Sequence, residues 1–354
     1  MIEQLQGDKF KDFKEFDNHE SVISFFDEDA GLRGFIAIHS KALGPATGGT
    51  RYWHYGGEEE AIKDVLNLSR AMTYKCALAR VPFGGGKAVI MANDRVDRSE
   101  LMRAFARVVN SLDGQFSTGE DVGIGDADIE AMAEVSPHIN GLPESSGDSS
   151  SMAALGVLYA IKAALGSIFG SEDLAGRKVA VKGLGKVGME LCGLLYREGC
   201  GLSVADIDDS RLMSARERFP KVNLFSSAEI HKLNVDIYSP CAMGGDFTER
   251  TIGELGCRII CGAANNQLAE TSLGASLHGK NIYYIPDYIA NAGGLIDVVD
   301  VLCNGSYDSG RVKKKVLGIK NTVSQILNLS RRADRSTSEI ADKLARRIIY
   351  GNVR

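Results

Sequence analysis

The sequence predicts a two-domain α/β protein: an N-terminal α/β domain, then a doubly wound domain with a parallel sheet, and a cleft between them. Its 354 residues suffice for two domains. From residue 178 onward, short apolar strands alternate with amphipathic helices, which is typical of parallel strands joined by crossover helices. A stretch rich in serine and glycine, residues 142–151, precedes this region. We therefore expect a first domain at 1–145, joined by a last helix at about 331–354, and a second at 146–330.

The elements follow from local patterns. In the first half, residues 34–39 read as a strand before a Gly-Pro turn, and residues 58–75 as a helix that opens with three glutamates. Further helices are predicted at 99–112 and 126–136, with a glycine-flanked acidic turn at 118–123 between them. In the second half we predict strands at 178–182, 202–206, 235–238, 258–261 and 282–285, and helices at 152–168, 187–198, 209–219 and 338–350.

Composition excludes several classes of function. A net charge of −5 without charge blocks argues against a nucleic-acid or anionic-membrane partner. The seven scattered cysteines form no Cys-x-x-Cys pair, which favours reduced thiols in the cytoplasm over a disulfide framework or a metal site. The N-terminus has no signal-peptide pattern, and we expect no apolar run of the roughly 18 residues that a membrane span needs. The sequence thus predicts a soluble cytoplasmic protein.

Two lysines stand out in the first half. Lys87 follows three glycines, Gly84–Gly86, and Lys75 lies twelve residues earlier, on the predicted helix face that also carries Met72. Glycines allow backbone to approach a small ligand, and two ammonium groups that converge favour the neutral amine of a general base. The alternatives remain open at this point: Lys87 as a solvated lysine after a turn, and Met72 as a core residue.

The second half carries a dinucleotide fingerprint. Residues 183–188 read Gly-Leu-Gly-Lys-Val-Gly, after a predicted strand and before a predicted helix. Asp206 ends the next strand, where a carboxylate accepts hydrogen bonds from the adenosine ribose and repels a 2′-phosphate. This context predicts NAD as the cofactor. Lys182 and Lys186 flank the turn; Lys186 is placed either near the pyrophosphate or in solvent.

Seven segments, in order, resemble the leucine/phenylalanine/valine branch of the amino-acid dehydrogenases, which are relatives of glutamate dehydrogenase. They cover about residues 35–300: Leu43–Arg51, Ser69–Lys75, Gly84–Lys87, Glu120–Gly123, Gly183–Gly188, Gly262–Leu268, and Pro286–Tyr288 with Asn291–Gly294. The resemblance implies an enzyme that converts an L-amino acid, water and NAD to a 2-oxo acid, ammonium and NADH. It also implies a homo-oligomer, a dimer or an octamer, formed through the N-terminal domain; the strand at 34–39 is a candidate interface.

The resemblance assigns roles to residues. Lys75 resembles the lysine that pairs with the substrate carboxylate, Lys87 the one that activates water, and Asp121 the carboxylate that handles the protons of the amine. Substrate contacts are implied for Gly48, Gly49, Met72 and Asn291, and a side-chain pocket for Thr47, Gly119, Leu295 and Val298. Cofactor contacts are implied for Gly183, Gly185, Lys186, Val187, Gly188, Asp206, Cys241, Asn265 and Ser150.

Some positions depart from the family pattern. Ser149 and Ser151 stand where the family has prolines, which we expect to loosen the hinge, and Ala153 replaces a threonine that helps to place the nicotinamide. Gly119 replaces an alanine usual in leucine-type members, which opens room for an aromatic ring, and Thr47 buries a hydroxyl that needs a partner.

The substrate and the alternatives follow from these positions. A branched-chain substrate is expected first, with an aromatic one (phenylalanine or tryptophan) as the alternative. Two further readings are a catalytically idle NAD-binding sensor and a hydroxy-acid dehydrogenase. The latter needs a histidine base, and none of the six histidines sits in a comparable motif.

Overall fold

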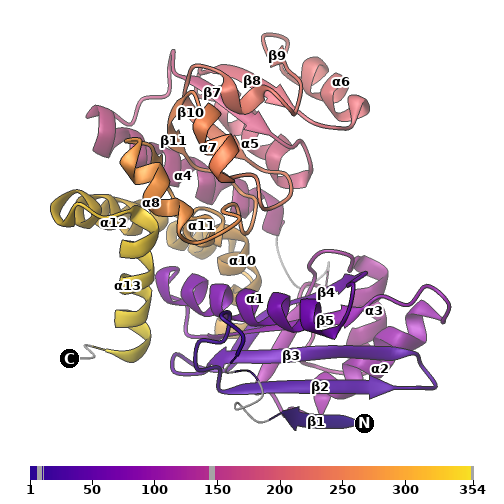
Figure 1. Ribbon diagram of the computed structural model, residues 1–354. Helices are drawn as coiled ribbons and strands as arrows, with labels where there is room; N and C mark the ends of the chain where they lie inside the picture. The colour runs from indigo at the N-terminus through magenta and orange to yellow at the C-terminus, as the bar shows by residue number, and fades with distance from the viewer. Residues whose placement is uncertain (6–9, 11, 143–147, 352–354) are drawn as a thin grey trace. The chain divides into compact units, whose positions relative to one another are not determined.

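The computed structural model describes residues 1–5, 10, 12–142 and 148–351, and the chain divides into two compact units (Figure 1). The first unit is Met1–Gly147 with Val301–Tyr307 and the segment from Ile348; the second is Asp148–Asp300 with Asp308–Arg347. Residues 143–147 of the expected linker and 352–354 of the expected last helix lie outside the described residues.

Helix α13 (Thr337–Tyr350) lies mostly in the second unit, whereas we expected residues from about 331 onward to join the first. Hydrogen bonds explain its place. Tyr288 Oη donates to Asp342 Oδ1 at 2.6 Å, and the Thr337 hydroxyl donates to the Tyr284 carbonyl. Tyr288 and Tyr284 both belong to the second unit.

The first unit contains a mixed six-stranded sheet in the order β1-β2-β3-β5-β4-β6. The strands are β1 (Ile2–Leu5), β2 (Ser21–Asp27), β3 (Leu32–Ser40), β4 (Ala46–Trp53), β5 (Gly84–Met91) and β6 (Phe116–Gly119). β4 runs parallel to β5 and β6, and the other pairs are antiparallel. The predicted strand at 34–39 is confirmed as β3. Because β3 pairs with β2 and β5, it offers no free edge, so the expectation that it forms an interface between subunits is wrong.

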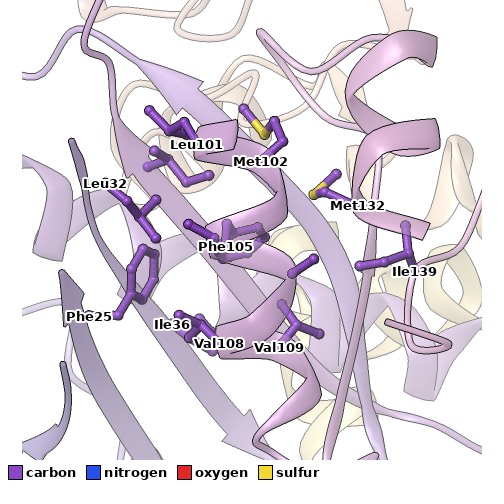
Figure 2. Packing of buried hydrophobic residues seen from close by; sticks show 14 of the residues in the cluster. Phe25, Leu32, Ile36, Leu101, Met102, Phe105, Val108, Val109, Met132 and Ile139 are labelled. Carbon is purple, nitrogen blue, oxygen red and sulfur yellow. The ribbon is translucent and has the colours of Figure 1, made fainter. Parts of the chain in front are cut away.

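Helices cover both faces of this sheet. Alternate residues of β3 point to opposite faces: Phe35 and Ala37 join a cluster with Val65 of α1 (Glu58–Leu78), whereas Ile36 joins a cluster with Phe105 of α2 (Arg98–Asn110). Figure 2 shows this second cluster, to which the short helix α3 (Asp126–Ala133) also contributes. The predicted helices at 58–75, 99–112 and 126–136 are therefore confirmed. Their burial fixes the strands that carry the candidate site.

The second unit contains a six-stranded, wholly parallel sheet in the order β12-β11-β10-β7-β8-β9. The strands are β7 (Lys178–Lys182), β8 (Gly201–Ala205), β9 (Asn223–Leu224), β10 (Val235–Pro240), β11 (Cys257–Ile260) and β12 (Tyr283–Tyr284). The chain builds outward from β7 first in one direction and then in the other. The carboxyl end of β7 is thus the switch point where such sheets bind ligands, as the sequence predicted for a Rossmann-type domain.

Among the residues that the structure describes, nine α-helices accompany this sheet before α13. They are α4 (Ser149–Phe169), α5 (Lys186–Arg197), α6 (Asp209–Arg218), α7 (Glu249–Glu254), α8 (Leu273–Gly279), α9 (Asp287–Ala290), α10 (Ala292–Asn304), α11 (Ser309–Leu317) and α12 (Ile319–Ala333).

Helix α4 is long and apolar enough to cross a membrane by length and composition, so the expectation that no apolar run reaches that length is wrong. More than half of its most apolar stretch is buried, and it packs against α5 and α12. It is therefore a core helix of the second unit. Ser149 and Ser151, which we expected to loosen a hinge, lie in its first turn, where the Asp148 side chain caps the helix by accepting from Ser150 N at 3.0 Å.

Candidate active site

The three glycines before Lys87 lie in strand β5 and face other parts of the protein. A Cβ at Gly85 would lie 2.0 Å from Thr73 N of α1, and one at Gly86 would lie 2.7 Å from the Phe116 ring. These glycines let α1 and the neighbouring side chains approach the strand, so the expectation that they make room for a ligand is wrong. Lys87 is a strand residue and is 6% exposed, which also excludes the solvated lysine after a turn.

Lys87 meets Asp121 in the interior of the first unit. Its Nζ lies 2.8 Å from Asp121 Oδ2, and Arg51 Nε lies 3.4 Å from the same oxygen. Burial raises the pKa of the Asp121 carboxyl, but the charges of Lys87 and Arg51 outweigh burial and hold that pKa below its usual value. Asp121 is therefore an ionised carboxylate held between two cations.

Glycines of β4 border this ion pair. A Cβ at Gly49 would lie 2.6 Å from the Glu120 carbonyl oxygen, 2.9 Å from Asp121 Cβ and 3.2 Å from Lys87 Nζ. One at Gly48 would lie 1.9 Å from the Gly86 carbonyl oxygen and 3.4 Å from Met72 Cγ. Met72 and Lys75 are three positions apart on α1 and are both half-buried, whereas Thr73 and Tyr74 between them are buried. The structure thus brings Gly48, Gly49, Met72, Lys87 and Asp121 together, and Lys75 follows Met72 on the same face of α1.

The two pocket candidates of this unit, Thr47 and Gly119, lie on adjacent strands, since β4 pairs with β6. The Thr47 hydroxyl is not orphaned: Ser117 Oγ donates to it at 3.1 Å, and Asn140 Nδ2 donates to Ser117 Oγ at 3.1 Å. A Cβ at Gly119 would lie 2.8 Å from the Asn140 carbonyl oxygen. The space beside Gly119 is thus filled by backbone, and the expectation that this glycine opens room for a ring is wrong.

In the second unit the glycine fingerprint forms the turn between β7 and α5. Gly183 has φ 98°, and a Cβ there would lie 2.6 Å from Ala242 N. A Cβ at Gly188 would lie 2.0 Å from the Gly183 carbonyl oxygen, whereas nothing lies within 4 Å of the Cβ position of Gly185. Gly185 also caps α5 without a side-chain hydrogen bond. The helix start therefore presents backbone N–H groups to open space, as an anion site does.

Each of the two units contains a segment that matches a known protein family. Residues 19–138 match the family model of the Glu/Leu/Phe/Val dehydrogenase dimerisation domain, and residues 204–321 match that of Glutamate/Leucine/Phenylalanine/Valine dehydrogenase. The chain belongs to the Glu/Leu/Phe/Val dehydrogenase family. It is an NAD-dependent amino-acid dehydrogenase with two α/β domains.

Individual relatives cover nearly the whole chain. It is 43% identical to L-tryptophan dehydrogenase of Nostoc punctiforme over 328 residues, 92% of either chain. It is 41% identical to leucine dehydrogenase of Bacillus subtilis, over 95% of this chain and 92% of that one. The crystal structure of the Nostoc punctiforme enzyme has a TM-score of 0.81 with this chain at 40% identity, and the similarity covers 94% of this chain and 96% of that one.

The residues of the second unit fit NAD. Asp206 lies at the predicted place after β8, but its carboxylate also holds the turn, since Oδ2 accepts from Leu184 N at 2.5 Å and Oδ1 from Asp208 N at 2.9 Å. Cys241, after β10, packs against the fingerprint, because a Cβ at Gly188 would lie 3.2 Å from Cys241 Cβ. Lys186 and Val187 open α5, and Lys186 is exposed there.

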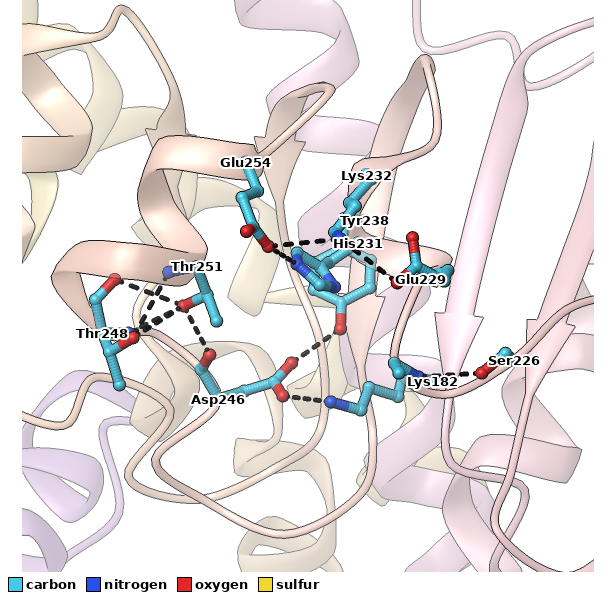
Figure 3. A network of polar contacts seen from close by, with 11 residues as sticks. Lys182, Ser226, Glu229, His231, Lys232, Tyr238, Asp246, Thr248, Thr251 and Glu254 are labelled. Carbon is cyan, nitrogen blue, oxygen red and sulfur yellow. Dashed lines mark hydrogen bonds and ion pairs between the residues drawn. The ribbon is translucent and has the colours of Figure 1, made fainter.

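Lys182, the last residue of β7, contacts the loop after β10. It forms an ion pair with Asp246, whose other oxygen accepts from Tyr238 Oη at 2.6 Å (Figure 3). This contact ties the loop after β10 to the end of β7, beside the fingerprint. Lys182 therefore stabilises the loop that carries Cys241.

The remaining candidates lie at the start of α10 and near it. Asn291 Nδ2 donates to the Ala263 carbonyl at 3.0 Å and to Asn265 Oδ1 at 2.6 Å, while the buried Asn291 Oδ1 has no hydrogen-bond partner among the described residues. The substrate contact expected of Asn291 stays a prediction. Leu295 and Val298 lie half-buried three residues apart on α10.

Sequence reasoning did not single out Arg51. It lies two residues after Gly49 in β4, so the period of a strand places both on one face. That spacing was the available signal. All seven cysteines are free thiols, and the described parts of the chain hold no group of three His, Cys, Asp or Glu side chains that could hold a metal ion.

Proposed function

We propose that this enzyme catalyses the reversible NAD-dependent oxidative deamination of a branched-chain L-amino acid (leucine, valine or isoleucine) to the 2-oxo acid, ammonium and NADH. The observation that carries the proposal is the buried contact of 2.8 Å between Lys87 Nζ and Asp121 Oδ2, beside Gly48 and Gly49 of β4. A lysine and a carboxylate in this arrangement can move protons between water, amine and solvent.

Each residue has a role in this proposal. Lys75 pairs with the substrate carboxylate, and the backbone at Gly48 and Gly49 contacts the substrate. Gly183, Gly185 and Gly188 of the fingerprint would hold NAD, which would supply the acceptor for the hydride of the α-carbon. Lys87, when its amine is neutral, takes the proton of the water that adds to the imino acid, and Asp121 accepts and returns the protons of the leaving amine.

The pocket residues of the first unit support the branched-chain choice. The carbonyl of Asn140 occupies the space beside Gly119, so that glycine adds no room for a ring. The hydroxyl of Thr47 is satisfied by Ser117 and carries no penalty for an unpaired group beside an apolar substrate. The second candidate is an aromatic substrate, which the similarity to L-tryptophan dehydrogenase favours.

The test is NADH formation at alkaline pH with L-leucine, L-valine, L-isoleucine, L-phenylalanine and L-tryptophan. We expect the highest kcat/KM on a branched-chain substrate, and higher values on the aromatic pair would establish the second candidate instead. Lys87→Ala and Asp121→Asn should each lower kcat by about 10² to 10⁴-fold. Lys63→Ala is the matched control, since Lys63 is exposed on α1 and pairs with Glu59. No turnover on all five, with NAD still bound, would indicate an NAD-binding sensor.

We further propose that the enzyme is a cytoplasmic homo-oligomer, a dimer or an octamer. The family match of residues 19–138 to a dimerisation domain supports assembly through the first unit. Light scattering of the purified protein measures the mass directly, and a monomer at micromolar concentration would refute this part.

A further inference from the structure

Arg51 is an unassigned cation at the candidate site. It shares one face of β4 with Gly49, and its Nε lies 3.4 Å from Asp121 Oδ2, the oxygen that Lys87 also contacts. Its side chain is only 18% exposed. Arg51 therefore contacts the proton-handling carboxylate inside the first unit, largely shielded from solvent.

The far end of Arg51 is anchored as well. Its Nη1 lies 3.1 and 2.9 Å from the two carboxylate oxygens of Asp64 on α1, and Tyr55 Oη donates to Asp64 Oδ2 at 2.7 Å. The guanidinium is thus hydrogen-bonded to Asp64 through Nη1, and its Nε makes an ion-pair contact with Asp121. The four side chains form a chain of alternating charge: Lys87, Asp121, Arg51 and Asp64.

The two positive and the two negative charges of these four side chains balance. The balance matters because the four side chains are shielded from water. The groups that face Asp121 are Lys87 from β5 and Arg51 from β4, with Tyr55 and Asp64 behind Arg51. With Lys87 alone, a buried carboxylate would have one cation to offset its desolvation; with Arg51 it has two.

We propose that Arg51 is a positioning residue of the reaction: it keeps Asp121 ionised and directs its Oδ2 toward Lys87, while Asp64 and Tyr55 hold Arg51 in place. The inference rests on the proposed function, in which Asp121 handles the protons of the amine. It assigns a role to three residues outside the expected site.

Two variants should act in opposite directions. Arg51→Gln removes a cation, so Asp121 should take up a proton at a pH about one unit higher than in the wild type. Asp64→Asn removes the negative charge that partly offsets the positive charge of Arg51. Asp121 should therefore take up a proton at a lower pH than in the wild type. Arg51→Lys keeps the charge and should restore most of the wild-type midpoint. A purely structural role would lower the melting temperature of both variants and leave the midpoint unmoved.

The readout is infrared titration of the free enzyme, in which the protonated carboxyl band of Asp121 is assigned by its loss in Asp121→Asn. The second readout is kinetic: Arg51→Gln should lower kcat about tenfold or more with a smaller change in KM, and Arg51→Lys should recover it. Arg177→Gln is the control, because the Arg177–Asp236 pair of the second unit is a partly buried Arg–Asp pair away from Asp121. It should match the wild type in both readouts.

The outcomes separate the inference from the function. Midpoints that stay put in Arg51→Gln and Asp64→Asn, or that move in the same direction, overturn the inference even if the enzyme turns over amino acids. If Arg51→Gln does not fold, Asp64→Asn carries the titration. A wild type without activity on any amino acid overturns the proposed function, while the titration still decides whether Arg51 controls Asp121.

Discussion

Replacing Gly49 with alanine tests whether the separation between β4 and Asp121 sets the rate. The new methyl carbon would lie 2.6 Å from the Glu120 carbonyl oxygen, 2.9 Å from Asp121 Cβ and 3.2 Å from Lys87 Nζ. The first two atoms belong to the segment that carries Asp121. The substitution therefore pushes on that segment directly.

The size of the effect follows from these distances. Ordinary contacts begin at 3.4 Å, so Glu120 and Asp121 must move by about 0.8 Å to relieve the closest one. The contact between Lys87 and Asp121 is 2.8 Å long, and a shift of this size takes it out of hydrogen-bond range. A misplacement of about 1 Å at a reacting group costs on the order of 10²-fold in rate. We expect kcat/KM to fall by roughly 10 to 100-fold, and the free energy of unfolding to fall by about 1–3 kcal/mol.

The assay is steady-state kinetics with the preferred amino acid, together with thermal unfolding. Gly253→Ala is the control, because nothing lies within 4 Å of its Cβ position on α7. It adds the same methyl group without a collision and should leave kcat unchanged. Wild-type kcat and melting temperature in Gly49→Ala would refute the reasoning, since the protein would then accommodate the methyl group without moving Asp121.

Three further predictions concern other parts of the chain. Gly185→Ala should keep the wild-type melting temperature but weaken NAD binding, whereas Gly188→Ala should lower both, because only Gly188 meets backbone, at 2.0 Å; equal effects of both in calorimetry would contradict this. Burial, and then the charge of His39, lower the pKa of His19 to about 4. As pH falls from 6.5 to about 4, His19 therefore takes up a proton in the unfolded protein before it does so in the folded protein. This difference lowers the free energy of unfolding by about 3 kcal/mol over that window. His19→Gln should flatten that part of the curve in urea unfolding, and an unchanged slope would refute it. Phe105→Ala should cost about 3–5 kcal/mol, because Phe105 is 0% exposed in the core of the first unit, whereas Phe105→Leu should cost less than about 1.5 kcal/mol.

The parallel sheet of the second unit was predictable because its signals are local. Each of its longer strands is a short apolar run, and the helix after the fingerprint begins where the glycine pattern requires it. In the first unit, β4 and β6 carry the glycines of the site and lack the continuous apolar pattern of a strand. They were therefore recognised as motifs and not as strands.

The space beside Gly119 could not be predicted from the sequence. Whether Gly119 opens space depends on Asn140, which pairs with β6 through Thr118 N to His138 O and Asn140 N to Thr118 O. That contact joins segments about twenty residues apart, and no local pattern indicates it. The identities of Lys87 and Asp121 were accessible from motifs, but their separation and their shared cation Arg51 required the fold.

The two units use glycine in different ways, and this difference follows from the ligands that they are proposed to bind. In the first unit Gly85 and Gly86 are filled by protein, so that α1 and β5 can hold buried charges at fixed distances. Charges shielded from water interact strongly, which suits proton transfer to a small zwitterion. At the start of α5 Gly185 leaves its Cβ position open, so that backbone N–H groups face outward. A diphosphate needs many weak donors rather than one strong base, and a helix start supplies them. The buried Lys87–Asp121 pair thus lies in the first unit, and the helix start that offers uncharged backbone N–H groups lies in the second.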